Sequence, residues 1–308
     1  MIEAYAEHSA GAADVAPLSR HQIESRLQQC APLPSLTRNT NELLELLNAP
    51  QPYSTQICDI IRRDPSLTAR ILRMVNSVYY GLATPVKSIE EAVFFIGMEQ
   101  IRQLTMFTPV IEDFQRLAGK TRFPWRQFWQ HCVGTAIMTR EVIASMFAPP
   151  QEIEYVAGLV HDVGKIAMSA AFPQHFSEIQ RRLAEGPADL LALETELLGL
   201  NHAELGALYL RRLNLPDVLV ETAQFHHQPH LATREPSTVA AVQIADLLVR
   251  HAHIGVSGNP AEVAPDDWLN AGGWNILFPH QGPDARALAH ASLQRSLEQI
   301  PKTLAGLI

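Results

Sequence analysis

Hydrophobic positions recur along most of the chain at intervals of three and four residues, which is the spacing of an amphipathic helix. In the N-terminal third, residues 41–47 and 54–61 both show this spacing. Ser88 is placed to cap a helix that runs to Ile96, and Gly97 is placed to end it. No segment shows the strict alternation of a half-buried strand. The pattern therefore predicts an all-α protein.

A second helical block begins near residue 123. The pattern predicts helices that carry His131, the pair His161-Asp162 and His202, and a shorter helix that ends at the pair His226-His227. It also predicts an apolar helix over residues 239–249 and a closing helix over residues 284–299. Residues 253–273 are rich in Gly, Pro and Asp and are expected to form a loop. We therefore divide the chain into a flexible N-terminus (1–17), an N-terminal helical lobe (18–113) and a second helical lobe (114–308).

Composition places the chain among folded globular proteins. Of its 308 residues, 47% are hydrophobic and 18% are charged, a balance that supports a sizeable core. The formal net charge is −8 and no dense Lys/Arg stripe is present, which argues against a nucleic-acid partner. No run approaches the roughly 18 apolar residues of a membrane span. Cys30, Cys58 and Cys132 are widely spaced, as expected for reduced thiols in a cytoplasmic protein.

Seven side chains of the second lobe have the chemistry of metal ligands: His131, His161, Asp162, His202, His226, His227 and Asp246. The adjacent pair His161-Asp162 offers a nitrogen and an oxygen ligand in one turn, a combination that suits Zn, Fe, Mn and related divalent ions. Asp246 stands among apolar residues, where an unpaired carboxylate is costly to bury, so a metal or an arginine is expected beside it. Gly206, one helical turn after His202, permits the close approach of a neighbouring backbone.

A histidine on a helix is more often a hydrogen-bonded residue than a ligand. The seven residues could therefore bind metal ions, or the buried imidazoles could hydrogen-bond the carboxylates without a metal. If metals are bound, they could act in catalysis or simply cross-link helices. The spacing of the residues leaves these alternatives open.

The order of these residues resembles the HD phosphohydrolase superfamily. His131, the pair His161-Asp162 and Asp246 reproduce its His…His-Asp…Asp order. The segments His202-Ala-Glu-Leu-Gly206 and Phe225-His-His227 resemble the HD-GYP branch, whose members hydrolyse cyclic di-GMP at sites with two or more metals.

The first lobe resembles the HDOD domain, the HD-related output domain of bacterial signalling proteins. The resemblance covers about residues 20–250 and rests on four segments: Leu33-Pro-Ser-Leu36, residues 61–72, Asn76-Ser-Val-Tyr-Tyr-Gly81 and residues 89–97. Many HDOD domains lack the metal-binding residues and are thought to act through protein contacts, whereas this chain retains them. Residues 76–81 are expected to fix the interface between the lobes, with a direct ligand site as the alternative.

The resemblance implies a dinuclear centre of Fe, Mn, Zn or similar divalent ions. Four residues would surround one ion: His131, His161, Asp162 and Asp246. Asp162 would bridge to a second ion held by His202, His226 and His227. A water between the ions would be activated for attack on phosphorus. Lys165 follows Asp162 as the lysine that faces substrate phosphate does in HD-GYP proteins, so Asp162 and Lys165 are the implied catalytic residues.

The chain also departs from the HD-GYP pattern. No Gly-Tyr-Pro segment follows His227, which weakens the case for cyclic di-GMP hydrolysis. Gln127 stands where some relatives have a glutamate ligand, which argues against a third metal. Two functions are therefore weighed. The first is a signalling module that acts through protein partners and keeps a metal centre. The second is a metal-dependent phosphohydrolase acting on a phosphate-containing small molecule, a nucleotide or cyclic dinucleotide.

Overall fold

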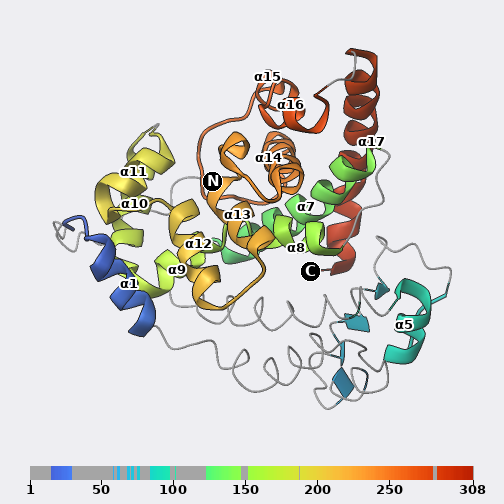
Figure 1. Cartoon of the computed structure of the whole chain (residues 1–308), viewed down its shortest axis with the longest axis horizontal. Coiled ribbons are helices and arrows are strands. Elements are labelled where there is room, and N and C mark those ends of the chain that lie inside the picture. The colour runs from blue at the N-terminus through green and yellow to red at the C-terminus, as the bar shows by residue number, and fades with distance from the viewer. Residues whose placement is uncertain are drawn as a thin grey trace.

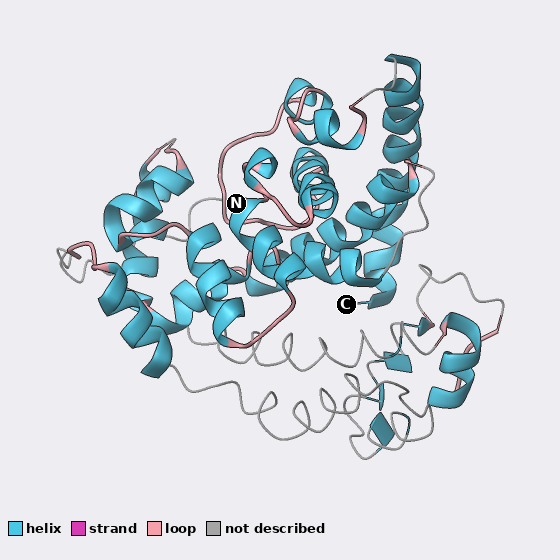
Figure 2. Cartoon of the chain, viewed as in Figure 1, coloured by secondary structure: helices cyan, strands magenta, loops and turns pink. Residues whose placement is uncertain are grey.

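All regular secondary structure among the described residues is helical, which confirms the all-α fold class (Figure 2). The computed structural model describes residues 15–29, 58, 61–62, 68–69, 71–72, 75–76, 84–97, 101, 123–146, 152–186, 188–279 and 283–307. The helices expected over residues 41–47 and 54–61 lie wholly or largely outside this part of the chain. No helix in the described ranges is both long enough and apolar enough to cross a membrane.

The part of the chain predicted to form the second lobe is built around two buried helices, α7 (Trp125–Ala144) and α14 (Pro236–His251), which pack against each other. The other helices of this lobe are α8 (Glu152–Val160), α9 (Val163–Ala171), α10 (Pro173–Glu185), α11 (Leu190–Leu198), α12 (His202–Arg212), α13 (Asp217–Phe225), α15 (Pro265–Leu269), α16 (Gly273–Leu277) and α17 (Pro283–Leu307), with a short 3₁₀ turn, η1 (Pro229–Leu231). Helices α8 and α17 pack on α7, and α9 and α13 pack on α12 (Figure 1).

The described part of the N-terminal region contains α1 (Arg20–Gln29) and α5 (Ile89–Ile96). Helix α5 begins and ends as predicted, because the Ser88 side chain accepts a hydrogen bond from the N–H of Glu91 and Gly97 forms the C-cap. Its buried residues belong to a small apolar core of their own. The Asn76 side chain bonds both backbone groups of Val86, at 2.7 and 2.6 Å. This pairing favours a structural role for Asn76, and residues 77–81 lie outside the described ranges.

Helix α1 packs through Ile23 and Leu27 into the same apolar core as α7 and α14. Just before it, the N–H of Leu18 donates to the carbonyl of Leu198. The lobe boundary expected near residue 113 falls in a part of the chain that the structure does not describe, so the division into lobes stays a prediction.

The stretch 253–273 differs from the loop expected there. It contains α15, and α16 begins at its end. Pro265 starts α15 at the first turn, where the missing N–H costs nothing. Trp268 within the stretch and Trp274 directly after it are both buried, so apolar side chains anchor the segment in spite of its Gly and Pro content. The closing helix α17 also runs further than expected, to Leu307.

Candidate metal centre

The structure brings the seven predicted residues together from five places in the chain. His131 lies in α7, the pair His161-Asp162 forms the turn between α8 and α9, and His202 is the first residue of α12. The pair His226-His227 directly follows α13, and Asp246 lies in α14. All are buried except His227, which is partly buried.

Close contacts at glycines hold the His161-Asp162 turn in place. A Cβ on Gly158 in α8 would lie 2.7 Å from the Cα of Ala136 in α7. A Cβ on Gly206 in α12 would lie 3.1 Å from the backbone nitrogen of Gly164 in α9. This confirms that Gly206 allows a neighbouring backbone to approach closely. The turn is thus fixed on one side to the helix that carries His131 and on the other to the helix that carries His202.

The two carboxylate oxygens of Asp162 face different sets of histidines. Its Oδ2 atom lies 3.4 Å from His161 Nε2 and 3.8 Å from His131 Nε2. Its Oδ1 atom lies 3.2 Å from His202 Nε2 and 3.7 Å from His226 Nε2. We call His131, His161, Asp246 and the Oδ2 atom of Asp162 the first ligand group. We call His202, His226, His227 and the Oδ1 atom of Asp162 the second ligand group.

Asp246 completes the first ligand group. Its Oδ1 atom lies 3.2 Å from His131 Nε2 and 3.8 Å from His161 Nε2. Its other oxygen, Oδ2, lies 3.6 Å from the guanidinium of Arg250, one turn further along α14. The sequence predicted a metal or an arginine beside this carboxylate. The structure places the arginine at one oxygen and the imidazoles at the other.

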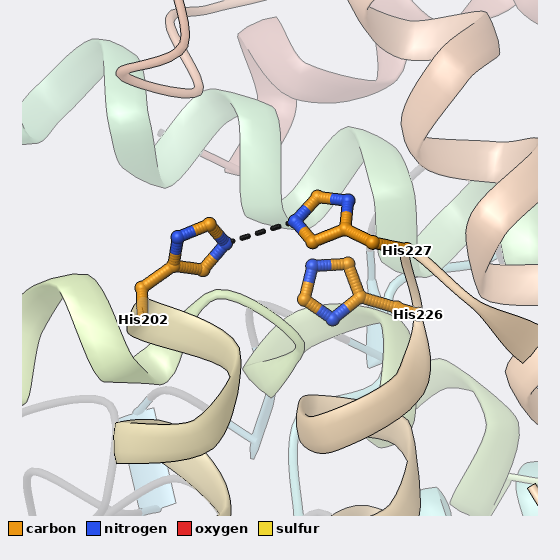
Figure 3. Close-up of side chains that lie close together, drawn as sticks. All are labelled: His202, His226 and His227. Atoms are coloured by element: carbon orange, nitrogen blue, oxygen red, sulfur yellow. Dashed lines mark hydrogen bonds between the residues drawn. The ribbon is translucent and has the colours of Figure 1, made fainter. Parts of the chain in front are cut away.

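The three imidazoles of the second ligand group point toward one another (Figure 3). The Nε2 atoms of His202 and His227 are 3.0 Å apart, and the rings of His226 and His227 have centroids 3.9 Å apart. One nitrogen from each ring lies within 4.8 Å of the others, as three atoms around a single cation would. The same spacing holds for His131, His161 and Asp162 in the first ligand group.

Three of the rings are held at Nδ1 so that Nε2 faces Asp162. The Nδ1 atom of His161 lies 2.8 Å from the carbonyl oxygen of Gly158, and that of His226 lies 3.0 Å from the carbonyl oxygen of Ala223. The Nδ1 atom of His202 lies 2.6 Å from Glu194 Oε2. An Nδ1–H that donates in this way leaves the Nε2 lone pair free for a metal.

Glu194 was not among the predicted site residues. It lies in α11 and is 2% exposed. The sequence does contain a pattern that could have indicated Glu194, because it lies four residues from both Leu190 and Leu198, on the apolar face of the helix. A charged residue on such a face needs a partner, but the sequence does not show that the partner is His202.

The donor atoms fit a metal ion better than they fit one another. Buried His131 Nε2, His161 Nε2, Asp162 Oδ1 and His226 Nε2 have no hydrogen-bond partner among the described residues. Most of their separations, 3.4–3.8 Å, exceed the usual 2.7–3.2 Å of an N–H···O bond. Buried polar atoms are rarely left unpaired, and imidazole and carboxylate donors suit borderline divalent ions. The buried histidines and aspartates could therefore bind metal ions.

Burial and charge give the histidines different protonation behaviour. Burial lowers the pKa of His131 and takes that of His227 down to about 3, while burial and the neighbouring imidazoles hold the pKa of His226 well below its ordinary value. Burial also acts against protonation of His161, but the carboxylates of Asp162 and Asp246 outweigh it and raise its pKa to about 9. His131, His226 and His227 are therefore neutral at pH 7, the form in which an imidazole can bind a cation.

Lys165 forms a buried ion pair with the central carboxylate. Its Nζ atom lies 2.6 Å from Asp162 Oδ2 and 2.9 Å from the carbonyl oxygen of Ser257, and the residue is 5% exposed. Burial alone would raise the pKa of Asp162, but Lys165 and His161 hold it well below its ordinary value. Asp162 is therefore an anion at neutral pH, the form in which a carboxylate can bind a cation.

Comparison with known proteins identifies the family. The sequence model of the HDOD domain matches residues 33–229. An uncharacterized protein of Treponema pallidum (strain Nichols) is 26% identical over 235 residues, which cover 74% of this chain and 44% of that protein. The chain spans less than half the length of the curated relatives that it matches.

Two crystal structures share the fold. An HDOD domain protein of unknown function from Geobacter sulfurreducens superposes with a TM-score of 0.79 at 22% identity, over 94% of this chain and 99% of that one. A candidate phosphohydrolase from Shewanella amazonensis gives 0.71 at 24% identity, over 93% and 98%. Since the domain match extends over more than half of the sequence, this chain belongs to the HDOD domain family.

Proposed function

We propose that this chain is a bacterial signal-transduction module of the HDOD type that acts through protein contacts and carries two divalent metal ions in its second lobe. The observation that carries the metal proposal is the placement of the Asp162 carboxylate, whose two oxygens face two different sets of imidazoles. A single carboxylate placed in this way can bridge two cations. The signalling role is supported by membership of the HDOD family.

The ligand sets differ in charge. The first ligand group would supply His131, His161, Asp162 and Asp246. The second ligand group would supply three imidazoles and the other oxygen of Asp162. Such mixed nitrogen and oxygen sets suit Fe, Mn or Zn.

A metal-dependent phosphohydrolase is the second candidate, and the position of Lys165 favours it. When bound, divalent ions lower the pKa of a coordinated water and polarise a phosphoryl oxygen. Lys165 contacts Asp162 directly, so its ammonium group would lie beside a phosphate held at the centre and offset its negative charge. The fold shared with the Shewanella candidate phosphohydrolase is consistent with this chemistry. The substrate class would be a nucleotide or a phosphodiester such as a cyclic dinucleotide.

Metal analysis of the purified protein tests the proposal. We expect about two equivalents of transition metal in protein prepared without added metal, and loss of both in Asp162→Ala. Asp266→Ala removes an exposed carboxylate of α15 and should leave the metal content unchanged. A folded wild-type protein that binds no metal at micromolar concentrations would refute the dinuclear centre.

A turnover assay then separates the two functions. Wild-type protein with two metals is tested against a panel of phosphodiesters and nucleotides, together with Asp162→Ala and Lys165→Met. Turnover that both substitutions abolish would establish the phosphohydrolase. A metal-loaded protein without turnover, which binds a protein partner in a metal-dependent way, would establish the signalling module.

A further inference from the structure

Glu194 makes two hydrogen bonds to a single residue of the second ligand group. Its Oε2 atom accepts from the backbone N–H of His202 at 2.8 Å and lies 2.6 Å from the Nδ1 atom of the same residue. The N–H of the first helical residue has no partner within its own helix. Glu194 therefore fixes both the start of α12 and the orientation of the imidazole.

The anchor of His202 differs in kind from those of the other rings. The Nδ1 atoms of His161 and His226 are held by backbone carbonyls, which are neutral. In the described part of the chain, no hydrogen bond is seen at Nδ1 of His131. His202 is held by a carboxylate, and a carboxylate on the far nitrogen makes an imidazole a stronger metal ligand.

The second ligand group also depends on Glu194 for negative charge. The first ligand group contains Asp246 in addition to its share of Asp162. The second ligand group offers three imidazoles, and its only anionic ligand atom among the described residues is Oδ1 of Asp162. A dication bound by the second ligand group would therefore be stabilised by the negative charge of the buried Glu194 carboxylate, which contacts the Nδ1 side of the His202 ring.

From this geometry we propose that Glu194 is a positioning residue that controls occupancy of the second ligand group, and so determines whether the centre holds one metal ion or two. The inference rests on the proposed dinuclear centre. Glu194 lies outside both ligand groups, and in this proposal it controls the step from one bound metal ion to two. Hydrolysis of a phosphodiester by two ions would need that step, whereas a structural metal would not.

Cobalt titration of metal-free protein tests the role of Glu194. Glu194→Gln keeps the size of the side chain and an oxygen that can accept from the His202 N–H, but removes the charge. Loss of an outer partner of a ligating histidine costs about 10–100-fold in metal affinity. We expect wild type to bind two Co²⁺ ions, and Glu194→Gln to bind the second about 10–100-fold more weakly with the first unchanged. The visible absorption bands of the second cobalt should appear only at higher Co²⁺ concentration.

Controls separate positioning from a purely structural role. Glu196→Gln removes an exposed glutamate from the same helix and should bind both ions like wild type. If Glu194→Gln does not fold, Glu194→Asp keeps the charge but shortens the reach, and should weaken the second ion by a smaller factor.

Three outcomes are distinguishable. Tight binding of both ions by a folded Glu194 variant would overturn this inference and leave the dinuclear centre intact. Equal weakening of both ions would also overturn it. A wild-type protein that binds fewer than two ions would instead refute the dinuclear centre on which the inference rests.

Discussion

Gly164 in α9 and His202 in α12 approach so closely that a Cβ on Gly164 would lie 1.8 Å from the carbonyl oxygen of His202. Gly164 is two residues beyond Asp162, and His202 begins the second ligand group. The contact therefore helps to set the distance between the central carboxylate and His202, which faces its Oδ1 atom. No side chain larger than hydrogen fits at this position unless the two helices move apart.

Gly164→Ala should therefore disturb both stability and metal content. Overpacking of a tight contact typically costs about 1–3 kcal/mol, and here the displaced atom is backbone, so the helices themselves must shift. We expect a loss of at least about 1 kcal/mol in urea unfolding and preferential loss of the second metal. Gly272→Ala is the matched control, because Gly272 is exposed, has helical dihedral angles and has no atom within 4 Å of its added Cβ. Wild-type stability in Gly164→Ala would contradict the proposed constraint.

The sequence predicted the fold class and the seven convergent residues, because both depend on residue type and order. Helical periodicity and the Ser88 and Gly97 caps are local features, and the structure reproduces them. The partners of the site residues could not be predicted in the same way. Glu194 meets His202 only after α11 folds against α12, and Ser257 meets Lys165 across 92 positions of sequence. Such hydrogen bonds depend on tertiary packing and produce no periodic pattern in the sequence from which the partners could be predicted.

The loop expected over residues 253–273 shows a related difficulty. Gly and Pro mark breaks in helices, and part of this stretch is indeed irregular. Its short helix α15 is held instead by the burial of Trp268, and a single large side chain has no periodicity. Composition therefore pointed to a loop where tertiary packing imposes a helical turn.

Lys165→Met is expected to destabilise the metal-free protein more than the metal-loaded protein. Removing one partner of a buried ion pair leaves the other charge uncompensated and typically costs about 3–5 kcal/mol. Bound cations would offset the charge of Asp162 in its place, so the difference between wild type and variant should shrink when metal is added. Chemical unfolding with and without a chelator measures both values. Lys87→Met, at an exposed lysine, should change neither, and equal effects in the two states would contradict the explanation.

Glu221→Gln should weaken the junction that leads into α14. The Glu221 carboxylate accepts backbone N–H groups of Thr233, Arg234 and Glu235, at 3.3, 3.1 and 2.9 Å. Burial would raise the pKa of Glu221, but these donors lower it below its ordinary value. Its contribution to stability is therefore complete above the pKa of an unfolded glutamate, about 4.3, and is lost as pH falls through the lowered pKa.

Glutamine at position 221 should cost about 1 kcal/mol at pH 7, as loss of a helix cap does. The gap between wild type and variant should close as the pH is lowered below about 4. Urea unfolding across this range measures the gap. Glu235→Gln changes an exposed glutamate in the same turn and should show no such dependence. A gap that persists at low pH would exclude the charge of Glu221 as its cause.

Metal binding should release protons and strengthen as pH rises. The pKa of His161 is raised to about 9, and that of His202 is also raised, because Glu194 outweighs the effect of burial. His161 is therefore protonated at both ring nitrogens in the metal-free protein at pH 7, and it must lose the Nε2 proton to bind a cation. The raised pKa of His202 acts in the same direction. His226 and His227, whose pKa values are lowered, are already neutral and should release none.

Calorimetric titration in buffers of different ionisation enthalpy counts the protons that metal binding releases, and we expect about one to two per protein at pH 7. The apparent metal affinity should increase between pH 6 and pH 8, since the bound state is the deprotonated one. An affinity that is flat over this range would mean that His161 is neutral before metal binds, and that Asp162 and Asp246 do not hold a proton on its imidazole.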